Sequence, residues 1–302
     1  MTACWLSGSG QAMLLLSSAT RFNLRPTEAV DAVRFSTRPL APIQFQAGLM
    51  EDSAAYATTA FANVLPGAGV LKTGKLQEPI LFASRPELLL ASLSCERMRD
   101  HEAIVVRGAA RYAAHAGYGT SLRFAAALDP ATSAATPVVL MDATDFRPKP
   151  PRHQFTAAAL RRELGKALVG CAAGNCATLA TGNWGCGAFG GCVELKFVLQ
   201  WVAASVCGAE LLYFHFGEAA LEPAAEFASA LRVADIPTGR VWSETLNWAS
   251  GRLGQTLEQG ESGALDAEPQ SPTVRAGTGL IAFLAQTFDL PTGPATLQFA
   301  SA

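Results

Sequence analysis

The sequence predicts an α/β protein in which a mixed sheet is flanked by helices on both faces. Two observations carry this prediction. Short aliphatic or β-branched runs, which are typical of buried strands, alternate along the chain with longer stretches of helix-forming residues. In addition, 50% of the 302 residues are hydrophobic and only 16% are charged, so the chain can bury a sizeable core. This composition excludes a disordered interaction protein.

The expected elements follow one another regularly. Strands are expected at residues 33–35, 43–45, 103–106, 138–141, 177–181 and 211–216. Helices are expected at residues 86–90, 155–169, 193–207, 223–233, 240–251 and 276–287. The first of these helices begins with Pro86, which suits a first turn because the N–H that proline lacks has no partner there. Residues 112–124 contain two tyrosines and are expected to form a glycine-containing loop.

Composition also suggests where the domain begins and ends. Residues 1–30 show little apolar periodicity and are interpreted as an N-terminal extension. Residues 255–273 are rich in Gly, Glu, Gln, Ser and Pro, which is typical of linkers. We therefore expect one domain over residues 31–254, followed by a linker-like tail over residues 255–302.

The charge balance restricts the possible ligands. Lys and Arg total 23 against 25 for Asp and Glu, and no basic stripe is present. Binding to DNA needs many cations to displace counterions, so we expect that this protein does not bind DNA. If the protein binds a phosphorylated ligand, we expect it to use backbone amides and helix ends.

No segment is expected to cross a membrane. The most apolar window, residues 197–216, is interrupted by Gln200, Gly208, Glu210 and His215. The start of the chain lacks the basic region of a secretory signal, so we expect an intracellular protein of the nucleus or cytoplasm. An organellar transit peptide is the alternative that the sequence leaves open.

The cysteines are odd in number and form no C-x-x-C pair. They are Cys4, Cys95, Cys171, Cys176, Cys186, Cys192 and Cys207. We expect free buried thiols in a reducing compartment, with no metal ion and no cofactor, although five cysteines between residues 171 and 207 leave a metal cluster as an alternative.

Residues 182–191, here called the second glycine loop, join an apolar strand to a long helix. Glycines permit close approach, and the helix N-terminus presents unpaired N–H groups, so this loop is suited to bind an anion. The spacing Gly185-x-Gly187-x-x-Gly190 also matches a dinucleotide fingerprint, with Glu218 after the next strand. A Rossmann-type NAD-binding protein, or a tight turn without a ligand, are therefore alternatives.

Residues 63–74, here called the first glycine loop, follow Phe61-Ala62 and lead into Gln77-Glu78-Pro79. A Rossmann domain does not need a second glycine loop that ends in an amide and an acid. An enzyme that cleaves a glycosidic bond does, because amides can hold a diphosphate and ribose while a carboxyl group reaches the leaving oxygen.

These segments together resemble the poly(ADP-ribose) glycohydrolase family, whose fold is a macrodomain. The similarity extends from about residue 33 to residue 251. Its strongest block is Thr181-Gly-Asn-Trp-Gly-Cys-Gly-Ala-Phe-Gly-Gly191. Tyr213-Phe-His-Phe-Gly217, Met141-Asp-Ala-Thr-Asp-Phe-Arg147 and Arg161-Arg-Glu-Leu164 are also similar to family segments.

The resemblance implies a set of ligand-binding residues. Asn63 and Gln77 would contact the terminal ribose, and Gly67, Ala68 and Gly69 the phosphate side. The diphosphate would lie on the second glycine loop, which supplies Asn183, Gly187, Ala188, Phe189 and Gly190. Tyr118 would cover the ligand, Phe216 would stack near the adenine, and Glu51 or Asp52 would be the acid on the adenine side.

Three positions depart from the family pattern. The second glutamate of the family's Gln-Glu-Glu, which acts as acid and base, is replaced by Pro79. The family's Asp before Phe-Ala-Asn is Ala60, and the middle glycine of its triplet is Ala68. Because proline has no proton to donate, we expect hydrolysis of the ribose–ribose bond to be weak or absent unless Glu78 substitutes.

The resulting prediction is a domain that recognises ADP-ribose or poly(ADP-ribose) chains, and through them ADP-ribosylated proteins. It is expected to be a monomer. An active glycohydrolase that uses Glu78 as acid and base is the alternative.

Overall fold

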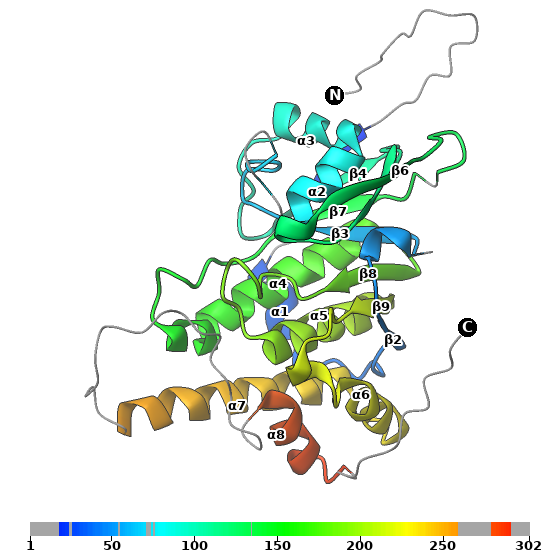
Figure 1. The fold of residues 1–302 in the computed structure, drawn as a ribbon. Helices are drawn as coiled ribbons and strands as arrows, with labels where there is room; N and C mark the ends of the chain where they lie inside the picture. Colours follow the sequence, from blue (N-terminus) through cyan, green and yellow to red (C-terminus); the bar gives the residue numbers. More distant parts are fainter. Residues whose placement is uncertain are drawn as a thin grey trace, which may run out of the picture.

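A computed structural model describes residues 18–23, 26–53, 55–70, 74, 76–133, 135–258 and 279–290. Within these residues, a seven-stranded mixed sheet has the order β1-β4-β7-β3-β8-β9-β2 (Figure 1). The strands are β1 (Ser18–Asn23), β2 (Ile43–Gln46), β3 (Ala57–Ala62), β4 (Glu102–Arg107), β7 (Val138–Asp142), β8 (Thr178–Gly182) and β9 (Glu210–Phe214). Strands β1 and β4 run antiparallel to their neighbours, and the other pairs are parallel.

Helices cover both faces of this sheet, as expected. They are α1 (Pro26–Val33), α2 (Gln77–Ser84), α3 (Leu89–Ser94), α4 (Ala157–Gly174), α5 (Val193–Cys207), α6 (Ala224–Val233), α7 (Thr238–Glu258) and α8 (Leu280–Thr287). The alternation along β7 shows the two layers. Val139 and Met141 face the larger cluster built with α1, α4 and α5, whereas Val138 and Leu140 face the cluster built with α2 and α3.

A separate two-stranded sheet lies beside the main one. It is a hairpin of β5 (Ala113–Ala116) and β6 (Arg123–Ala127), joined by the short helix η3 (Gly119–Ser121). Residues 112–124 were predicted as a loop, so this prediction was wrong. Every residue of β6 is exposed, and without a buried face the segment gives no period-two signal.

Two further differences concern small or mixed segments. The strand predicted at residues 33–35 was wrong: Val30 and Val33 point into the core from α1, and Phe35 is 71% exposed in the following turn. Strand β3 (Ala-Thr-Thr-Ala-Phe-Ala) and edge strand β1 were not predicted, because neither has the aliphatic composition of the other strands.

The predicted domain boundaries at residues 30 and 254 stay predictions. Strand β1, before the first boundary, pairs with β4, and α8, after the second, is held by the carboxylate of Glu194, which accepts a hydrogen bond from the Leu280 N–H (2.9 Å). The rest of the predicted extension and tail, residues 1–17, 259–278 and 291–302, lies outside the described residues. Among the described helices, none combines the length and the apolar character that a bilayer crossing needs.

Candidate functional site

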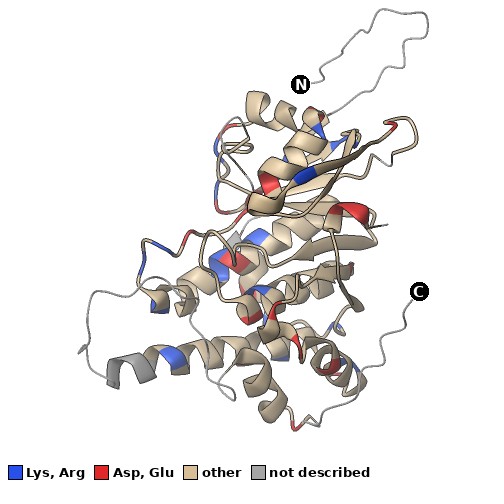
Figure 2. Ribbon diagram, viewed as in Figure 1, with Lys and Arg blue, Asp and Glu red and all other residues tan. Residues whose placement is uncertain are grey.

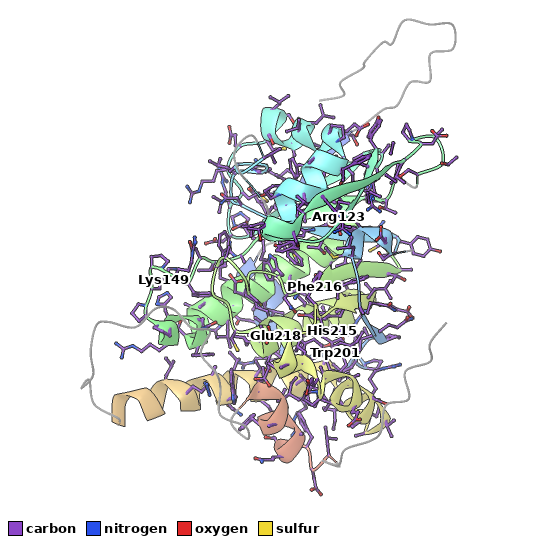
Figure 3. The ribbon with its side chains drawn as sticks, viewed as in Figure 1. Arg123, Lys149, Trp201, His215, Phe216 and Glu218 are labelled. Carbon is purple, nitrogen blue, oxygen red and sulfur yellow. The ribbon has the colours of Figure 1, made fainter. Side chains whose placement is uncertain are left out.

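The predicted site residues gather at one edge of the sheet. Strands β7, β3, β8 and β9 are neighbours and parallel, so their carboxyl ends lie together. The first glycine loop follows β3, the second follows β8, and Phe216 follows β9 (Figure 3). Ligands of open α/β sheets bind at such an edge, in the crevice beyond the carboxyl ends of the strands.

One carboxylate, that of Glu78, holds the first glycine loop by hydrogen bonds. Glu78 is 5% exposed, and its two oxygens accept hydrogen bonds from the backbone N–H groups of Gly67 (2.8 Å) and Asn63 (3.2 Å). Burial raises the pKa of Glu78 to about 7, against the smaller opposing effect of these two hydrogen bonds. Glu78 therefore holds the loop, and its burial makes a protonated form accessible near neutral pH.

The neighbouring Gln77 is used in a similar way. Its side-chain oxygen accepts a hydrogen bond from Phe61 N–H (2.8 Å), and its side-chain nitrogen donates to Thr59 O (3.1 Å). These bonds attach the start of α2 to β3. The Asn63 side chain accepts from Leu65 N–H (3.2 Å) within the loop itself.

Pro79 lies on the inner side of the same loop. It is buried, and a Cβ added to Gly74 would lie 2.6 Å from its ring, whereas one added to Gly69 would lie 3.3 Å away. The loop thus closes against the proline ring. Ala68 is exposed, so its methyl group does not press on a neighbouring element.

The second glycine loop is fixed from below by core residues. The Trp184 ring is fully buried and donates to Met141 O (3.1 Å). Gly185 has a φ of +75°, and a Cβ there would lie 2.5 Å from that of Ala143. Gly191 N–H donates to Gly185 O (2.9 Å) and closes the loop. Only glycine therefore fits at position 185.

Asn183 fixes the loop to the adjacent strand. Its side-chain nitrogen donates to His215 O (3.0 Å), and its oxygen accepts from the Tyr213 hydroxyl (3.1 Å). A ligand that contacts the Asn183 side chain would therefore have to share its nitrogen and oxygen with His215 and Tyr213.

The rim of the second loop is open. Gly187 and Gly190 are exposed, and a Cβ on Gly187 would meet nothing within 4 Å. Among the described residues, the N–H groups of Gly187, Ala188 and Phe189 have no hydrogen-bond acceptor. Three successive N–H groups are thus available as donors, and runs of such groups are used by proteins to bind phosphates.

An ion pair lies beneath this loop. The Lys196 ammonium group is buried, pairs with Glu163, and lies 3.8 Å from the centre of the Trp184 ring. Glu163 also accepts hydrogen bonds from Thr144 N–H (3.1 Å) and Thr144 Oγ1 (2.6 Å). Burial lowers the pKa of Lys196 well below its usual range. In Figure 2, acidic and basic positions adjoin one another along α4 at this level.

Tyr118, Glu51 and Phe216 border the site from three segments. Tyr118 (51% exposed) lies at the tip of the β5–β6 hairpin, and Phe216 (50% exposed) follows β9 with a φ of +53°. Partial burial and the Glu51 carboxylate raise the pKa of Tyr118, against a smaller opposing effect of the nearby Gln77 backbone. The structure thus brings Tyr118 to the start of α2, on the side of Glu51. The ring of Phe216 lies over Gly182, where an added Cβ would be 3.1 Å from it.

The match to a family model identifies the family of this chain. The model of the poly(ADP-ribose) glycohydrolase catalytic domain, with the macro domain fold, matches residues 30–223. The chain belongs to this family. The Rossmann alternative is thereby excluded for the fold, and the glycine spacing of the second loop is a feature of a macrodomain.

Named members of the glycohydrolase family are similar to the chain over most of its length. It is 30% identical over 268 residues to the probable poly(ADP-ribose) glycohydrolase 2 of Arabidopsis thaliana, covering 72% of this chain and 51% of the relative. It is 33% identical over 220 residues to poly(ADP-ribose) glycohydrolase 1 of Caenorhabditis elegans, covering 66% and 28%. The chain spans about half or less of the length of these curated relatives.

A solved structure is similar as well. A mutant of the poly(ADP-ribose) glycohydrolase of Deinococcus radiodurans, in complex with ADP-ribose, aligns with a TM-score of 0.47 and 15% identity. The alignment covers 72% of this chain and 93% of that one.

Two groups of residues that contact the predicted site segments were missed by sequence reasoning. Lys196 and Glu163 lie in predicted helices, and a lysine within an otherwise apolar helix was the available signal. Arg111, which contacts the Glu51 segment, gave no signal, because it lies in a stretch between two strands.

The cysteines agree only in part with the prediction. Every cysteine that the structure describes is a free thiol, and Cys4 lies outside the described residues. Of the described cysteines only Cys171 is buried, and the others are partly buried except Cys207, which is exposed because it is the last residue of α5. Among the described residues, His, Cys, Asp and Glu side chains form no group of three that could hold a metal ion.

Proposed function

We propose that this domain binds ADP-ribose, as the free compound or at the ends of poly(ADP-ribose) chains on modified proteins, and that it hydrolyses the ribose–ribose bond of the polymer weakly or not at all. The observation that carries the binding is the row of free N–H groups at Gly187, Ala188 and Phe189, at the carboxyl edge of a macrodomain sheet. An amide row that follows a strand and precedes a helix suits a diphosphate.

The remaining predicted residues surround this row in a consistent way. With the diphosphate on the second loop, the distal ribose would lie toward Asn63 and Gln77, and Gly67–Gly69 would face the phosphate side. The adenine would lie toward Phe216, Tyr118 and Glu51. The two half-exposed rings at this end offer stacking surfaces for a base.

Weak catalysis follows from the residues at and beside the position of the family's catalytic glutamate. Pro79 has no ionisable group, and both oxygens of Glu78 are engaged by loop N–H groups. To protonate a leaving oxygen, Glu78 would have to turn away from these donors and release the loop. Loss of general acid–base assistance lowers a rate by about 10²–10⁴-fold.

A binding titration and a hydrolysis assay test the two parts of the proposal, the binding of ADP-ribose and the weak hydrolysis. ADP-ribose binding is measured by calorimetry, and release of ADP-ribose from poly(ADP-ribose) is measured for wild type, Pro79→Glu and the matched control Pro79→Ala. We expect binding by the wild type, a gain of hydrolysis of at least ten-fold in Pro79→Glu only, and no gain in Pro79→Ala. Absence of ADP-ribose binding by the folded wild type would refute the binding, and wild-type turnover at enzymatic rates would refute the weak catalysis.

One observation favours the second candidate, an active hydrolase. A buried carboxyl group whose pKa lies at about 7 is suited to general acid catalysis at neutral pH. In this case Glu78→Gln abolishes wild-type hydrolysis, whereas Glu222→Gln, at an exposed acid that follows the short helix η5 (Ala219–Leu221), leaves it unchanged. Turnover that survives Glu78→Gln rules this candidate out.

A further inference from the structure

Arg111 joins two segments that are far apart in the sequence. This buried side chain lies between β4 and β5, and its Nε donates to Ala113 O (3.2 Å) in the first residue of β5. Its Nη1 donates to Glu51 O (3.1 Å) and to the Asp52 carboxylate (2.5 Å) in the short helix η1 (Met50–Asp52). One planar guanidinium group therefore fixes the β5–β6 hairpin against η1.

Each joined segment carries one residue of the proposed adenine end. Glu51 belongs to η1, and Tyr118 follows β5. The hairpin is a sheet of its own, and an isolated two-stranded hairpin is only marginally stable in water. The place of Tyr118 thus depends on anchors at the base of the hairpin. These are Arg111 and Tyr112, whose N–H donates to Ser84 O (2.9 Å) and whose hydroxyl donates to Glu87 (2.6 Å).

Arg111 also distinguishes two adjacent acids. The Asp52 carboxylate forms an ion pair with Arg111. The Glu51 carboxylate has no hydrogen bond or ion pair to any described residue, and it lies near enough to Tyr118 to raise the pKa of that hydroxyl. The sequence left Glu51 and Asp52 open as the adenine-side acid. The ion pair engages one oxygen of the Asp52 carboxylate, whereas neither oxygen of Glu51 has a hydrogen bond within the described residues, although the Arg85 guanidinium lies near enough to interact with it. We therefore take Glu51 as the acceptor.

We propose that Arg111 is a positioning residue for the adenine end of the site, holding Glu51 and Tyr118 at the spacing that an adenosine group requires. This inference rests on the proposed binding of ADP-ribose and extends it to the part of the ligand that gives specificity. Arg111 does not touch the ligand. It acts through the two residues that do.

The test compares ADP-ribose with ribose 5-diphosphate, which lacks the adenosine end, by calorimetric titration. The variants are Arg111→Lys, which keeps the charge but cannot make the same fork of hydrogen bonds, and Arg123→Lys on the outer strand of the same hairpin as control. Figure 3 shows Arg123 on β6. We expect Arg111→Lys to weaken ADP-ribose binding at least ten-fold, with ribose 5-diphosphate binding unchanged within two-fold. Arg123→Lys should change neither.

A general structural role would weaken the binding of both ligands equally, and this result would overturn the inference, as would unchanged binding of ADP-ribose.

A second experiment covers poor folding of Arg111→Lys. Asp52→Ala removes an exposed partner of the same guanidinium, and we expect at least a three-fold loss of affinity for ADP-ribose alone. Tyr118→Ala should weaken wild-type binding but add little in the Asp52→Ala background. Additive losses would contradict a shared role. Failure of the wild type to bind either ligand would instead refute the proposed function.

Discussion

The two glycine loops at the edge of the sheet are held in different ways. The second loop is supported by a buried tryptophan, a closing backbone hydrogen bond and the ion pair of Lys196 and Glu163. The first loop is clasped by the single carboxylate of Glu78 and closes against the ring of Pro79. The loop proposed to bind the diphosphate is thus built into the core, whereas the loop beside the proposed catalytic register depends on one titratable group.

This difference would allow the proposed binding to persist without catalysis. A preformed donor row needs only rigid support, and α4 and α5 supply it from the core. Catalysis needs in addition a carboxyl group that is free to exchange a proton. In the first loop the available carboxyl group has a structural task, and the next position is a proline.

The largest expected effect concerns the support of the second loop. Lys196→Met removes the ammonium partner of the buried Glu163, which keeps its ion pair with Arg162 (2.7 Å). Leaving a buried charge with no partner costs about 3–5 kcal/mol, so we expect the lower end of this range. The free energy of unfolding, measured in urea, should fall by at least about 3 kcal/mol. Lys149→Met, the same substitution in the loop after β7, should change it by less than about 0.5 kcal/mol. Similar losses in both variants would show that the pair does not support the loop.

The second effect separates glycines of the same loop. Gly185→Ala combines a left-handed φ with a Cβ 2.5 Å from Ala143, so we expect the protein to lose about 3 kcal/mol of stability. Gly187→Ala places its methyl group in open space and should leave the unfolding free energy unchanged. We expect the same methyl group to weaken ADP-ribose binding at least ten-fold, because it covers the free N–H row. Normal affinity in folded Gly187→Ala would place the diphosphate elsewhere.

The third effect is a pH dependence that originates in the first loop. The folded-state pKa of Glu78, about 7, lies above the unfolded value of about 4.5, so the folded state binds the extra proton between these values. The contribution of Glu78 to stability is therefore fully present below pH 4.5 and is lost as the pH rises through 7. Between pH 5 and pH 7 this contribution falls by about 2 kcal/mol.

The measurement compares wild type with Glu78→Gln, which does not titrate, in urea unfolding at several pH values. The difference between the two unfolding free energies should drift with pH by this amount. A difference that is constant from pH 5 to pH 7 would show that Glu78 titrates normally.

The smallest effect concerns the altered glycine triplet. Ala68 is exposed, so Ala68→Gly removes no clash and only adds backbone freedom. We expect a loss of about 0.5 kcal/mol in urea unfolding and a change in ADP-ribose affinity of less than three-fold. A large gain in affinity would show that the methyl group obstructs the ligand.

The sequence predicted most of the fold because most elements carry their own signal. Helix α5 agrees with the prediction at both ends, since an apolar run follows the glycines and Gly208 ends it with a positive φ. Strand β3 was missed because its small residues resemble a helix or loop, and it becomes a strand only between β7 and β8. Pairing with these two neighbouring strands, rather than the local sequence, therefore determines that the segment is a strand.

The candidate site was predictable where backbone and motif coincide, and less so where side chains meet across elements. Glu78 and the second loop were singled out from the sequence pattern, and Asn63 and Gly67 through the resemblance to the family, and their ligand roles stay predictions. That the Glu78 carboxylate is occupied by two loop N–H groups could not be read from the sequence, because it depends on how α2 packs beneath the loop. Arg111 depends on two segments about sixty residues apart.

The free N–H row of the second loop has one more consequence, which concerns competition inside a cell. Lys196 and Arg147, the cations that contact this loop, are each paired with a carboxylate. Attraction at such a site is short-ranged, so the affinity for ADP-ribose should hardly change between 50 and 200 mM salt, whereas sites built on phosphate–lysine contacts weaken steeply over this range. Longer polyanions, whose binding depends on many exposed cations, would then compete poorly for the site. The domain would recognise its ligand by shape in a crowd of more highly charged molecules.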